Sequence, residues 1–341
     1  MKRITIHDIA RELNITFSTV ARALRDHPAI SEATKAAVRK TAEKLNYHQN
    51  KLASSLRSGS THIIGVIVPS LDVSFFSSVV HGIEKVMNEN GYSILLYQSN
   101  ELLKQEKKGI DTFLQSRVDG IICSVSLETD QYSHYEEIKK RNIPLIFFDR
   151  DVAALETPSV TINDYKGGFI ATEHLIQQGY ERIVHITAAR GLPIFKERLR
   201  GYKDALKRHK LPVRKELILQ GEFSLEFGRS CIRMLREKNI PFDAVFALED
   251  YTAMGVIQQL QEYKVKVPKE TGVIGFANES FGALVSPGLS TIDQQTVKMG
   301  QEAARLFLKM IRHKQEEEQM PADKLVLDPV LIVRGSSARK R

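Results

Sequence analysis

Apolar residues among the first 47 positions recur at spacings of three and four, which predicts short amphipathic helices. Thr5, Thr16 and Ser31 precede these runs, and each can cap a helix by accepting a hydrogen bond from a backbone N–H. Asn14 lies between the first two runs and tolerates the left-handed backbone of a tight turn. The expected inward positions are Ile6, Ile9, Ala10, Leu13, Val20, Ala23, Leu24, Ala33, Ala37, Val38, Ala42 and Leu45. Three short helices with tight joints are therefore expected here.

From His62 onward, short β-rich runs alternate with helical stretches. Two examples of the β-rich runs are IIGVIV at 63–68 and PLIFFD at 144–149. Continuous apolar runs of this length are typical of strands in a parallel sheet that is covered on both faces. About 270 residues of such alternation suffice for two sheets of this kind. The expected fold is a small all-α head plus an α/β body made of two doubly wound parallel-sheet lobes.

The positive charge is concentrated at the amino end of the chain. The whole chain carries a net charge of +8, and residues 1–60 contain eleven Lys/Arg against five Asp/Glu. The last three residues are basic as well, so the middle of the chain is close to neutral. A compact basic head on a near-neutral body suggests a polyanionic partner, nucleic acid first. A solvated basic face is the alternative interpretation.

Several classes of protein fit the sequence poorly. No run approaches the roughly 18 apolar residues of a membrane span, and the amino end lacks the apolar region of a signal peptide. Cys123 and Cys231 are the only cysteines, too few for a disulfide framework or a structural zinc site. The nucleotide-binding and hydrolase motifs GxGxxG, GxxxxGK[ST], GxSxG and HExxH are missing. We expect a cytoplasmic, nucleoid-associated protein with no membrane partner, no metal, no cofactor and no catalytic residues.

Two short helices joined by a tight turn in a basic segment are typical of a helix-turn-helix. The second helix would enter the major groove, with Phe17, Ser18 and Arg22 facing base edges. Arg22 can form the bidentate contact to guanine O6 and N7. The candidate phosphate contacts are Thr5, Thr16 and Thr19. A small helical protein-binding domain with incidental charge is the alternative.

Residues 5–59 resemble the head of the LacI/GalR family of bacterial transcription regulators. The matching motifs are Asp8-Ile9-Ala10, Ile15-Thr16, Thr19-Val20-Ala21-Arg22, Ile30-Ser31 and Leu45-Asn46-Tyr47. Asn14 stands where glycine is usual in that family. Arg25 stands where asparagine is common, and it adds a candidate phosphate contact.

The same resemblance identifies residues 50–59 as the family's hinge helix. It implies that this helix folds when two subunits lie side by side on DNA, with Leu56 wedged into the minor groove at a central CpG step. Small Ala53 would let the paired helices approach each other and the groove floor. The further contacts implied with phosphates or groove edges are Asn50, Lys51 and Arg57. A plain flexible linker is the alternative.

Residues 60–335 resemble the sensor domain of this family, which shares its fold with periplasmic sugar-binding proteins. Its markers include IIGVIVPSLDVSFFSSVVHGIE, IPLIFFDRD and DAVFALEDYTAMGVIQQL. The resemblance implies crossover strands between the two lobes and a ligand cleft between them. The candidate effector contacts are Asp72, Phe75, Phe76, Asp149, Arg198, Glu249, Asp250 and Asn278. Helix caps, surface charges and a core position for one phenylalanine are the alternatives.

Two departures from the family pattern obscure the ligand. Glu249-Asp250 replaces a common Asn-Asp, and Ala277-Asn278 replaces a common Asp-Asp. Alanine at 277 removes an acceptor for a ligand hydroxyl, which Glu249 would supply from another position in the cleft. The expected effector is a sugar or sugar derivative. A ligand of another class and a protein co-effector are the alternatives.

The expected organisation is a helix-turn-helix domain (1–48), a hinge (49–60), a two-lobed effector-binding and dimerisation domain (61–335) and a basic tail (336–341). The expected function is that of a ligand-responsive regulator, a repressor in the first instance, that binds a pseudo-palindromic operator in double-stranded DNA as a homodimer. A solute-binding transport protein and an enzyme are the alternatives. The run IRHKQEEEQM at 311–320 predicts a short charged loop without heptads, which favours a dimer.

Overall fold

The computed structural model describes residues 4–47, 60–189, 192–315 and 323–339 of the 341-residue chain. The chain divides into two compact units, Met1–Thr61 and His62–Arg341. Among the helices in the described ranges, none is both long enough and apolar enough to cross a membrane.

The described part of the first unit, the head, contains three helices, as predicted. They are α1 (Ile6–Glu12), α2 (Phe17–Ala23) and α3 (Glu32–Lys44). Thr16 and Ser31 cap α2 and α3 through their side-chain oxygens, and Asn14 has a φ of 50°, the left-handed turn that its position predicts. The small core between the helices consists of Ile9, Ala10, Val20, Ala23, Val38 and Ala42.

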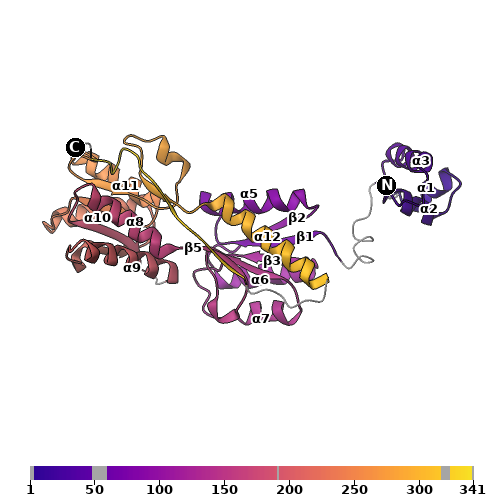
Figure 1. The fold of residues 1–341 in the computed structure, drawn as a ribbon, viewed down its shortest axis with the longest axis horizontal. Coiled ribbons are helices and arrows are strands. Elements are labelled where there is room, and N and C mark those ends of the chain that lie inside the picture. Colours follow the sequence, from indigo (N-terminus) through magenta and orange to yellow (C-terminus); the bar gives the residue numbers. More distant parts are fainter. Residues whose placement is uncertain (1–3, 48–59, 190–191, 316–322, 340–341) are drawn as a thin grey trace. The chain divides into compact units, whose positions relative to one another are not determined.

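The first lobe of the second unit is built on a six-stranded parallel sheet with the order β11-β5-β4-β3-β1-β2 in the described residues. Its strands are β1 (Ile63–Val68), β2 (Ser93–Gln98), β3 (Gly120–Cys123), β4 (Leu145–Phe148), β5 (Ser159–Ile162) and β11 (Lys324–Leu327). One face is covered by α5 (Ser74–Glu89) and α12 (Thr296–Gln315), and the other by α6 (Leu103–Gln115) and α7 (Ser133–Lys140) (Figure 1).

The second lobe repeats this plan on a four-stranded parallel sheet with the order β7-β6-β8-β9 within the described ranges. Its strands are β6 (Ile183–Ala188), β7 (Ile218–Gly221), β8 (Ala244–Ala247) and β9 (Gly272–Ile274). One face is covered by α8 (Asp164–Gln177) and α9 (Pro193–Arg208), and the other by α10 (Leu225–Glu237) and α11 (Asp250–Glu262). The short 3-10 helices of the body are η1 (Ala153–Leu155), η2 (Lys215–Leu217) and η3 (Ser280–Ala283).

In the described residues the chain passes between the lobes three times. It leaves the first lobe after β5, returns through β10 (Thr291–Asp293) into α12, and crosses again from β11 to β12 (Val330–Ile332) (Figure 1). Strand β10 pairs with β12 in an antiparallel two-stranded sheet. The predicted α/β body of two doubly wound lobes with crossover segments is confirmed.

One prediction about the end of α12 was wrong. The segment 311–315 continues this helix instead of starting a charged loop. Met310 is buried and Ile311 packs against the core of the first lobe, so the apolar face of α12 extends into the charged run. Residues 316–320 of that run lie outside the described ranges.

The helices that cover the sheets approach each other closely at glycines. A Cβ on Gly201 of α9 would lie 2.1 Å from the carbonyl oxygen of Tyr165 in α8. A Cβ on Gly168 of α8 would lie 2.1 Å from the carbonyl oxygen of Arg198 in α9. Two further pairs, α5 with α12 and α10 with α11, meet in the same way at Gly82, Gly300, Gly228 and Gly255. Close backbone packing of this kind fixes the position of Arg198 on α9.

Candidate functional site

Helix α2 presents the predicted DNA-contacting side chains on the surface of the head. Phe17 is 54% exposed, and Ser18 and Arg22 are exposed as well. Val20 and Ala23 of the same helix are fully buried. The apolar positions therefore hold α2 in the head and leave its polar face open to a groove.

The threonines at the helix starts bond within the head. Thr16 Oγ1 accepts a hydrogen bond from the Thr19 N–H at 3.2 Å and lies 2.9 Å from Thr19 Oγ1 and 2.8 Å from Ser18 Oγ. The N–H and the hydroxyl of Thr5 both donate to the carboxylate of Asp8, each at 2.8 Å. These contacts stabilise the helix starts, and the phosphate contacts of the threonines stay predictions.

The basic side chains of the head differ in whether a carboxylate neutralises them. Ion pairs join Lys35 to Glu32, Arg39 to Asp26 and Lys44 to Glu12. Arg22 and Arg25 are exposed, and neither forms an ion pair with any described residue. An exposed guanidinium without a carboxylate partner can bind a guanine edge or a phosphate.

The predicted contacts of the hinge lie outside the described residues. They are Asn50, Lys51, Ala53, Leu56 and Arg57. Their roles stay predictions that rest on the family resemblance.

A cavity of about 410 Å³ is lined by both lobes of the body. Ser70, Glu101, Leu127, Asp149 and Arg150 reach it from the carboxyl ends of β1 to β4 in the first lobe. Phe223, Leu248, Glu249, Phe276 and Ala277 reach it from the carboxyl ends of β7 to β9 in the second. In open parallel sheets this edge is where ligands bind, and the volume suits a small molecule.

Aromatic rings form much of the cavity wall. Phe75 and Phe76 of α5 both line the cavity and are 6% and 4% exposed, and their rings meet edge to face at 5.0 Å. Both also belong to the core of the first lobe, so the two roles that the sequence left as alternatives coincide. The rings from the second lobe are Phe195, Phe223, Tyr251 and Phe276. Flat apolar walls of this kind pack against the faces of sugar or base rings.

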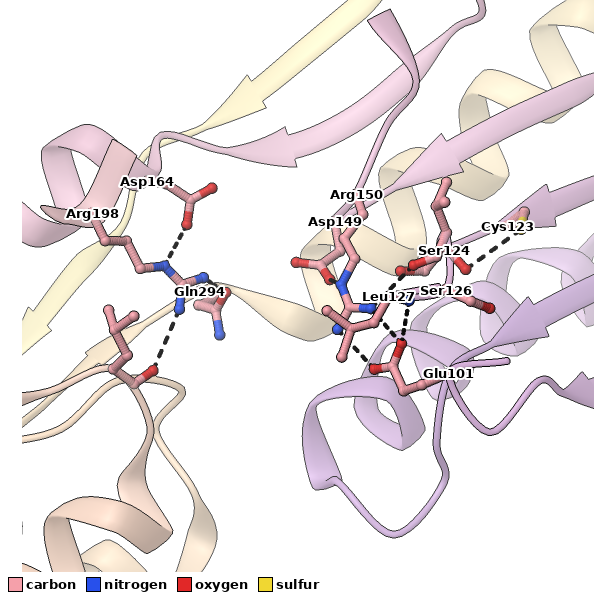
Figure 2. Close-up of polar contacts among 12 residues, drawn as sticks. Glu101, Cys123, Ser124, Ser126, Leu127, Asp149, Arg150, Asp164, Arg198 and Gln294 are labelled. Carbon is pink, nitrogen blue, oxygen red and sulfur yellow. Dashed lines mark hydrogen bonds and ion pairs between the residues drawn. The ribbon is translucent and has the colours of Figure 1, made fainter. Parts of the chain in front are cut away.

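Arg198 is held rigidly at one side of the cavity (Figure 2). Its Nε donates to Asp164 at 2.6 Å, and its two Nη atoms donate to the Leu248 carbonyl at 3.4 Å and to Gln294 at 3.2 Å. The guanidinium carbon lies 3.8 Å from the ring centroid of Phe276. Burial raises the pKa of Asp164, and the charge of Arg198 opposes that rise. A guanidinium has five N–H donors, so Arg198 keeps donors for a ligand.

A second arginine lies at the opposite side of the cavity, on the first lobe (Figure 2). The two Nη atoms of Arg150 donate to the Glu101 carboxylate at 2.8 and 3.0 Å, the bidentate arrangement that is strongest for this pair. Glu101 also accepts the Leu127 N–H at 2.8 Å, and Arg150 donates to the Val125 carbonyl at 3.1 Å. This network fixes the segment after β3 at the cavity wall.

Asp149 has a carboxylate at the cavity whose oxygens can still accept hydrogen bonds. It is 5% exposed, lines the cavity and has a φ of 60°. No described residue donates a hydrogen bond to its carboxylate, and Arg150 Nε approaches one oxygen only to 3.5 Å. Burial raises the pKa of Asp149 to about 6, and the charge of Arg150 limits the rise. A ligand hydroxyl would supply the missing donor.

Glu249 also lines the cavity, but its oxygens are shared with a helix start. Its carboxylate accepts the N–H groups of Tyr251 and Thr252 at 3.0 and 2.9 Å and so caps α11. Burial raises the pKa of Glu249. Glu249 therefore caps a helix, which was the alternative interpretation, and also lines the cavity.

Three predicted effector contacts are not among the residues that line the cavity in the described part of the chain: Asp72, Asp250 and Asn278. Asp72 is exposed after β1. Asp250 is fully buried and accepts the Glu279 N–H and the Thr291 hydroxyl, both at 2.7 Å, and burial raises its pKa to about 7. Asn278 accepts a hydrogen bond from Arg334 at 2.9 Å. Effector contact by these three stays a prediction.

Several wall residues were not predicted from the sequence. Glu101 and Leu127 lie in the segments that follow β2 and β3. The rule that ligands bind at the carboxyl ends of strands would therefore have found them. Arg150 neighbours the predicted Asp149. Phe195 and Gln294 carry no comparable signal, since only the packing of α9 and the crossover after β10 bring them to the cavity.

The comparisons with known proteins agree with this architecture. Residues 5–50 match the family of bacterial regulatory proteins, lacI family, and residues 61–324 match the periplasmic binding proteins and sugar binding domain of the LacI family. The chain is 31% identical to the HTH-type transcriptional regulator DegA of Bacillus subtilis, over 98% of each chain.

Two solved structures extend the likeness to the whole fold. The Lac repressor dimer bound to operator and the anti-inducer ONPF superposes with a TM-score of 0.86 at 21% identity, over 99% of this chain and 100% of that one. The complex of the transcriptional regulator CelR with cellobiose gives a TM-score of 0.71 at 25% identity, over 98% and 100%. With both of its units matched, this chain belongs to the LacI family and is a DNA-binding transcription regulator with a sugar-binding type of sensor domain, not an enzyme.

Proposed function

We propose that this protein is a repressor that binds a pseudo-palindromic operator as a homodimer and responds to a sugar or sugar derivative. One observation carries the proposal: a single chain joins helix α2, whose Arg22 is exposed and forms no ion pair with a described residue, to a body whose two lobes enclose a common cavity. Two heads related by two-fold symmetry fit two half-sites of a palindrome. Such a regulator works on chromosomal DNA in the bacterial cytoplasm.

The proposed operator contacts divide by role. Phe17, Ser18 and Arg22 reach base edges in the major groove, and Leu56 opens the minor groove at the centre. The proposed backbone and groove-edge contacts are Thr5, Thr16, Thr19, Arg25, Asn50, Lys51, Ala53 and Arg57.

The chemistry of the cavity supports a polyhydroxylated, uncharged effector. Asp149 provides an acceptor without a donor, and Arg198 provides donors without a full set of acceptors. Arg150 already pairs with Glu101, and Arg198 with Asp164. Neither arginine therefore needs an anionic ligand to neutralise its charge. The aromatic rings offer flat surfaces to a sugar ring. The cellobiose complex of CelR gives a precedent of the same fold.

The response to the effector follows from where the cavity lies. A ligand that contacts both lobes changes the relative free energy of their open and closed arrangements, which shifts the population between them. In the proposed mechanism, closure alters the spacing of the two hinges of the dimer, and the hinges order or melt. If effector binding changes the affinity for operator DNA by some factor, linkage requires that operator DNA change the affinity for the effector by the same factor.

The deciding experiment is selection of binding sites from random duplex DNA with the purified full-length protein. Recovery of a palindrome with a central CpG step supports the proposal and supplies a probe for screening sugars. If no motif is enriched, the selection is repeated with a pooled sugar and metabolite library. Failure in both rounds contradicts sequence-specific operator binding.

A further inference from the structure

Helix α9 and the segment that follows it carry an excess of positive charge that the function described so far does not use. Residues 196–215 contain nine Lys/Arg against two Asp/Glu. The cations are Lys196, Arg198, Arg200, Lys203, Lys207, Arg208, Lys210, Arg214 and Lys215. Arg198 is buried at the cavity, and the other eight lie at or near the surface of the second lobe.

Four of these cations form a straight row, the α9 stripe, which consists of Lys196, Arg200, Lys203 and Lys207. Their spacings of four, three and four place them on one face of the helix. With a rise of about 1.5 Å per residue, the stripe is about 16 Å long. The opposite face of α9 is buried and includes Phe195, Arg198, Gly201, Tyr202, Ala205 and Leu206. The stripe therefore faces away from the lobe that α9 covers.

Carboxylates neutralise little of this charge. Arg200 and Lys207 pair with Glu197 and Asp204 one helical turn away, in exposed ion pairs of the kind that contribute little. No described residue forms an ion pair with any of five further cations: Lys196, Lys203, Lys210, Arg214 and Lys215. The guanidinium of Arg200 also lies 4.4 Å from the ring centroid of Tyr165, which keeps it extended on the surface.

The surface around the stripe lacks the features of a protein–protein interface. Between residues 192 and 217, no large apolar side chain of the described chain is among the exposed ones. Protein interfaces depend on buried aromatic or apolar anchors at their centre. Contacts to a nucleic acid backbone need only a row of cations that replace condensed counterions.

We propose that the α9 stripe binds the phosphate backbone of duplex DNA, as a contact separate from the helix-turn-helix head. The contact is independent of sequence, because lysine and arginine side chains reach phosphates and no base-reading element accompanies them. It raises the affinity of the protein for long DNA. It also makes that affinity fall more steeply as the salt concentration rises.

The test measures binding of the full-length protein to a fluorescent duplex of about 80 base pairs without an operator, at several salt concentrations. The stripe variant carries Lys196→Gln, Arg200→Gln, Lys203→Gln and Lys207→Gln. The slope of log affinity against log salt changes by about 0.9 for each phosphate contact. The expected result is a slope shallower by about 2 to 4 than that of the wild type.

A charge-matched control separates local contact from bulk charge. It carries Lys85→Gln, Lys104→Gln, Lys108→Gln and Lys140→Gln, four exposed lysines of the first lobe. The control should keep the wild-type slope, and so should a variant in which lysine and arginine are exchanged within the stripe. Arg22→Ala in the head should abolish operator selectivity and leave the contribution of the stripe intact, so failure of the operator proposal is seen separately.

Two outcomes overturn the inference. A stripe variant with the wild-type slope shows that the stripe does not touch DNA, and would turn attention to an acidic protein surface. An equal change in the stripe variant and the charge-matched control shows a general effect of net charge. Circular dichroism and thermal unfolding confirm that each variant is folded before the slopes are compared.

Discussion

Four acidic residues singled out at the cavity or the lobe junction have separate physical roles. Asp164 neutralises Arg198, Asp250 holds backbone and hydroxyl donors, and Glu249 caps α11 while also lining the cavity. Asp149 has no donor among the described residues and faces the cavity. The sequence identifies most of these residues as candidates, because they follow strands. It cannot assign their roles, since Asp164 and Asp250 bind partners 29 to 41 residues away along the chain, one of which lies in the crossover strand β10.

Asp149→Asn should lower the affinity for the sugar identified by screening by about ten- to a hundredfold, because a hydrogen bond to a charged acceptor contributes about 1.5–3 kcal/mol. Wild-type affinity should fall as the pH drops through about 6, where the carboxyl group takes up a proton. Isothermal titration calorimetry between pH 5 and 8 measures both effects. Asp111→Asn, at an exposed carboxylate of α6 that does not line the cavity, is the matched control. Equal pH dependence in Asp149→Asn and wild type would contradict the role of this carboxylate.

Asp250→Asn should reduce the pH dependence of stability. Burial raises the folded pKa of Asp250 from 3.8 to about 7. Its contribution to the free energy of unfolding is therefore full below pH 3.8 and is lost as the pH rises through about 7. Asparagine keeps both contacts, because its oxygen accepts the Glu279 N–H and its NH₂ donates to the Thr291 hydroxyl.

Urea unfolding at pH 5 and pH 8 measures this effect. The wild type should lose more stability than Asp250→Asn between the two pH values, and the variant should be the more stable one at pH 8, by about 1–3 kcal/mol on the scale of 1.36 kcal/mol per pKa unit. A variant that is less stable than the wild type at both values would show that the carboxylate is needed ionised.

At the scale of elements, the strands at the centres of the sheets were predictable and those at the crossovers were not. IIGVIV becomes β1, which pairs on both sides with β2 and β3, and its continuous apolar pattern reports burial on both faces. Strands β10, β11 and β12 have three or four residues. Leu325, Val326 and Val330 are apolar but exposed in β11 and β12, so the apolar runs there do not report burial on both faces. Their pairing is set by the two lobes and not by local sequence.

Gly201→Ala should destabilise the second lobe by about 1–3 kcal/mol, the usual cost of overpacking. The added Cβ would lie 2.1 Å from the Tyr165 carbonyl oxygen, so α8 and α9 must separate. Gly282→Ala in η3 is the control, because the nearest contact of its Cβ, Arg334 Nη1, would lie 3.5 Å away. Urea unfolding should show the larger loss for Gly201→Ala. A stability equal to that of the wild type would mean that the helix pair has room to relax.

At the scale of the whole molecule, specific DNA binding is predicted to depend on the hinge as well as the head. Leu56→Ala should weaken binding to the selected operator and leave nonspecific, salt-dependent binding largely intact, because the wedge acts only where the duplex is kinked. Gel shifts with operator and nonspecific duplexes measure the two affinities, with Ser58→Ala as the neighbouring control. An equal loss on both duplexes would rule out the wedge.

The three crossings between the lobes also constrain how the protein is made. The six-stranded sheet is complete only when nearly the whole chain has left the ribosome, since β11 forms its edge, and the two-stranded sheet of β10 and β12 forms later still. Ser336, which follows β12, donates its hydroxyl to the Val273 carbonyl and accepts the Ser290 N–H in the buried interior. A premature stop codon before residue 324 would therefore damage both lobes at once. The two lobes are therefore completed together, by the last part of the chain to be made.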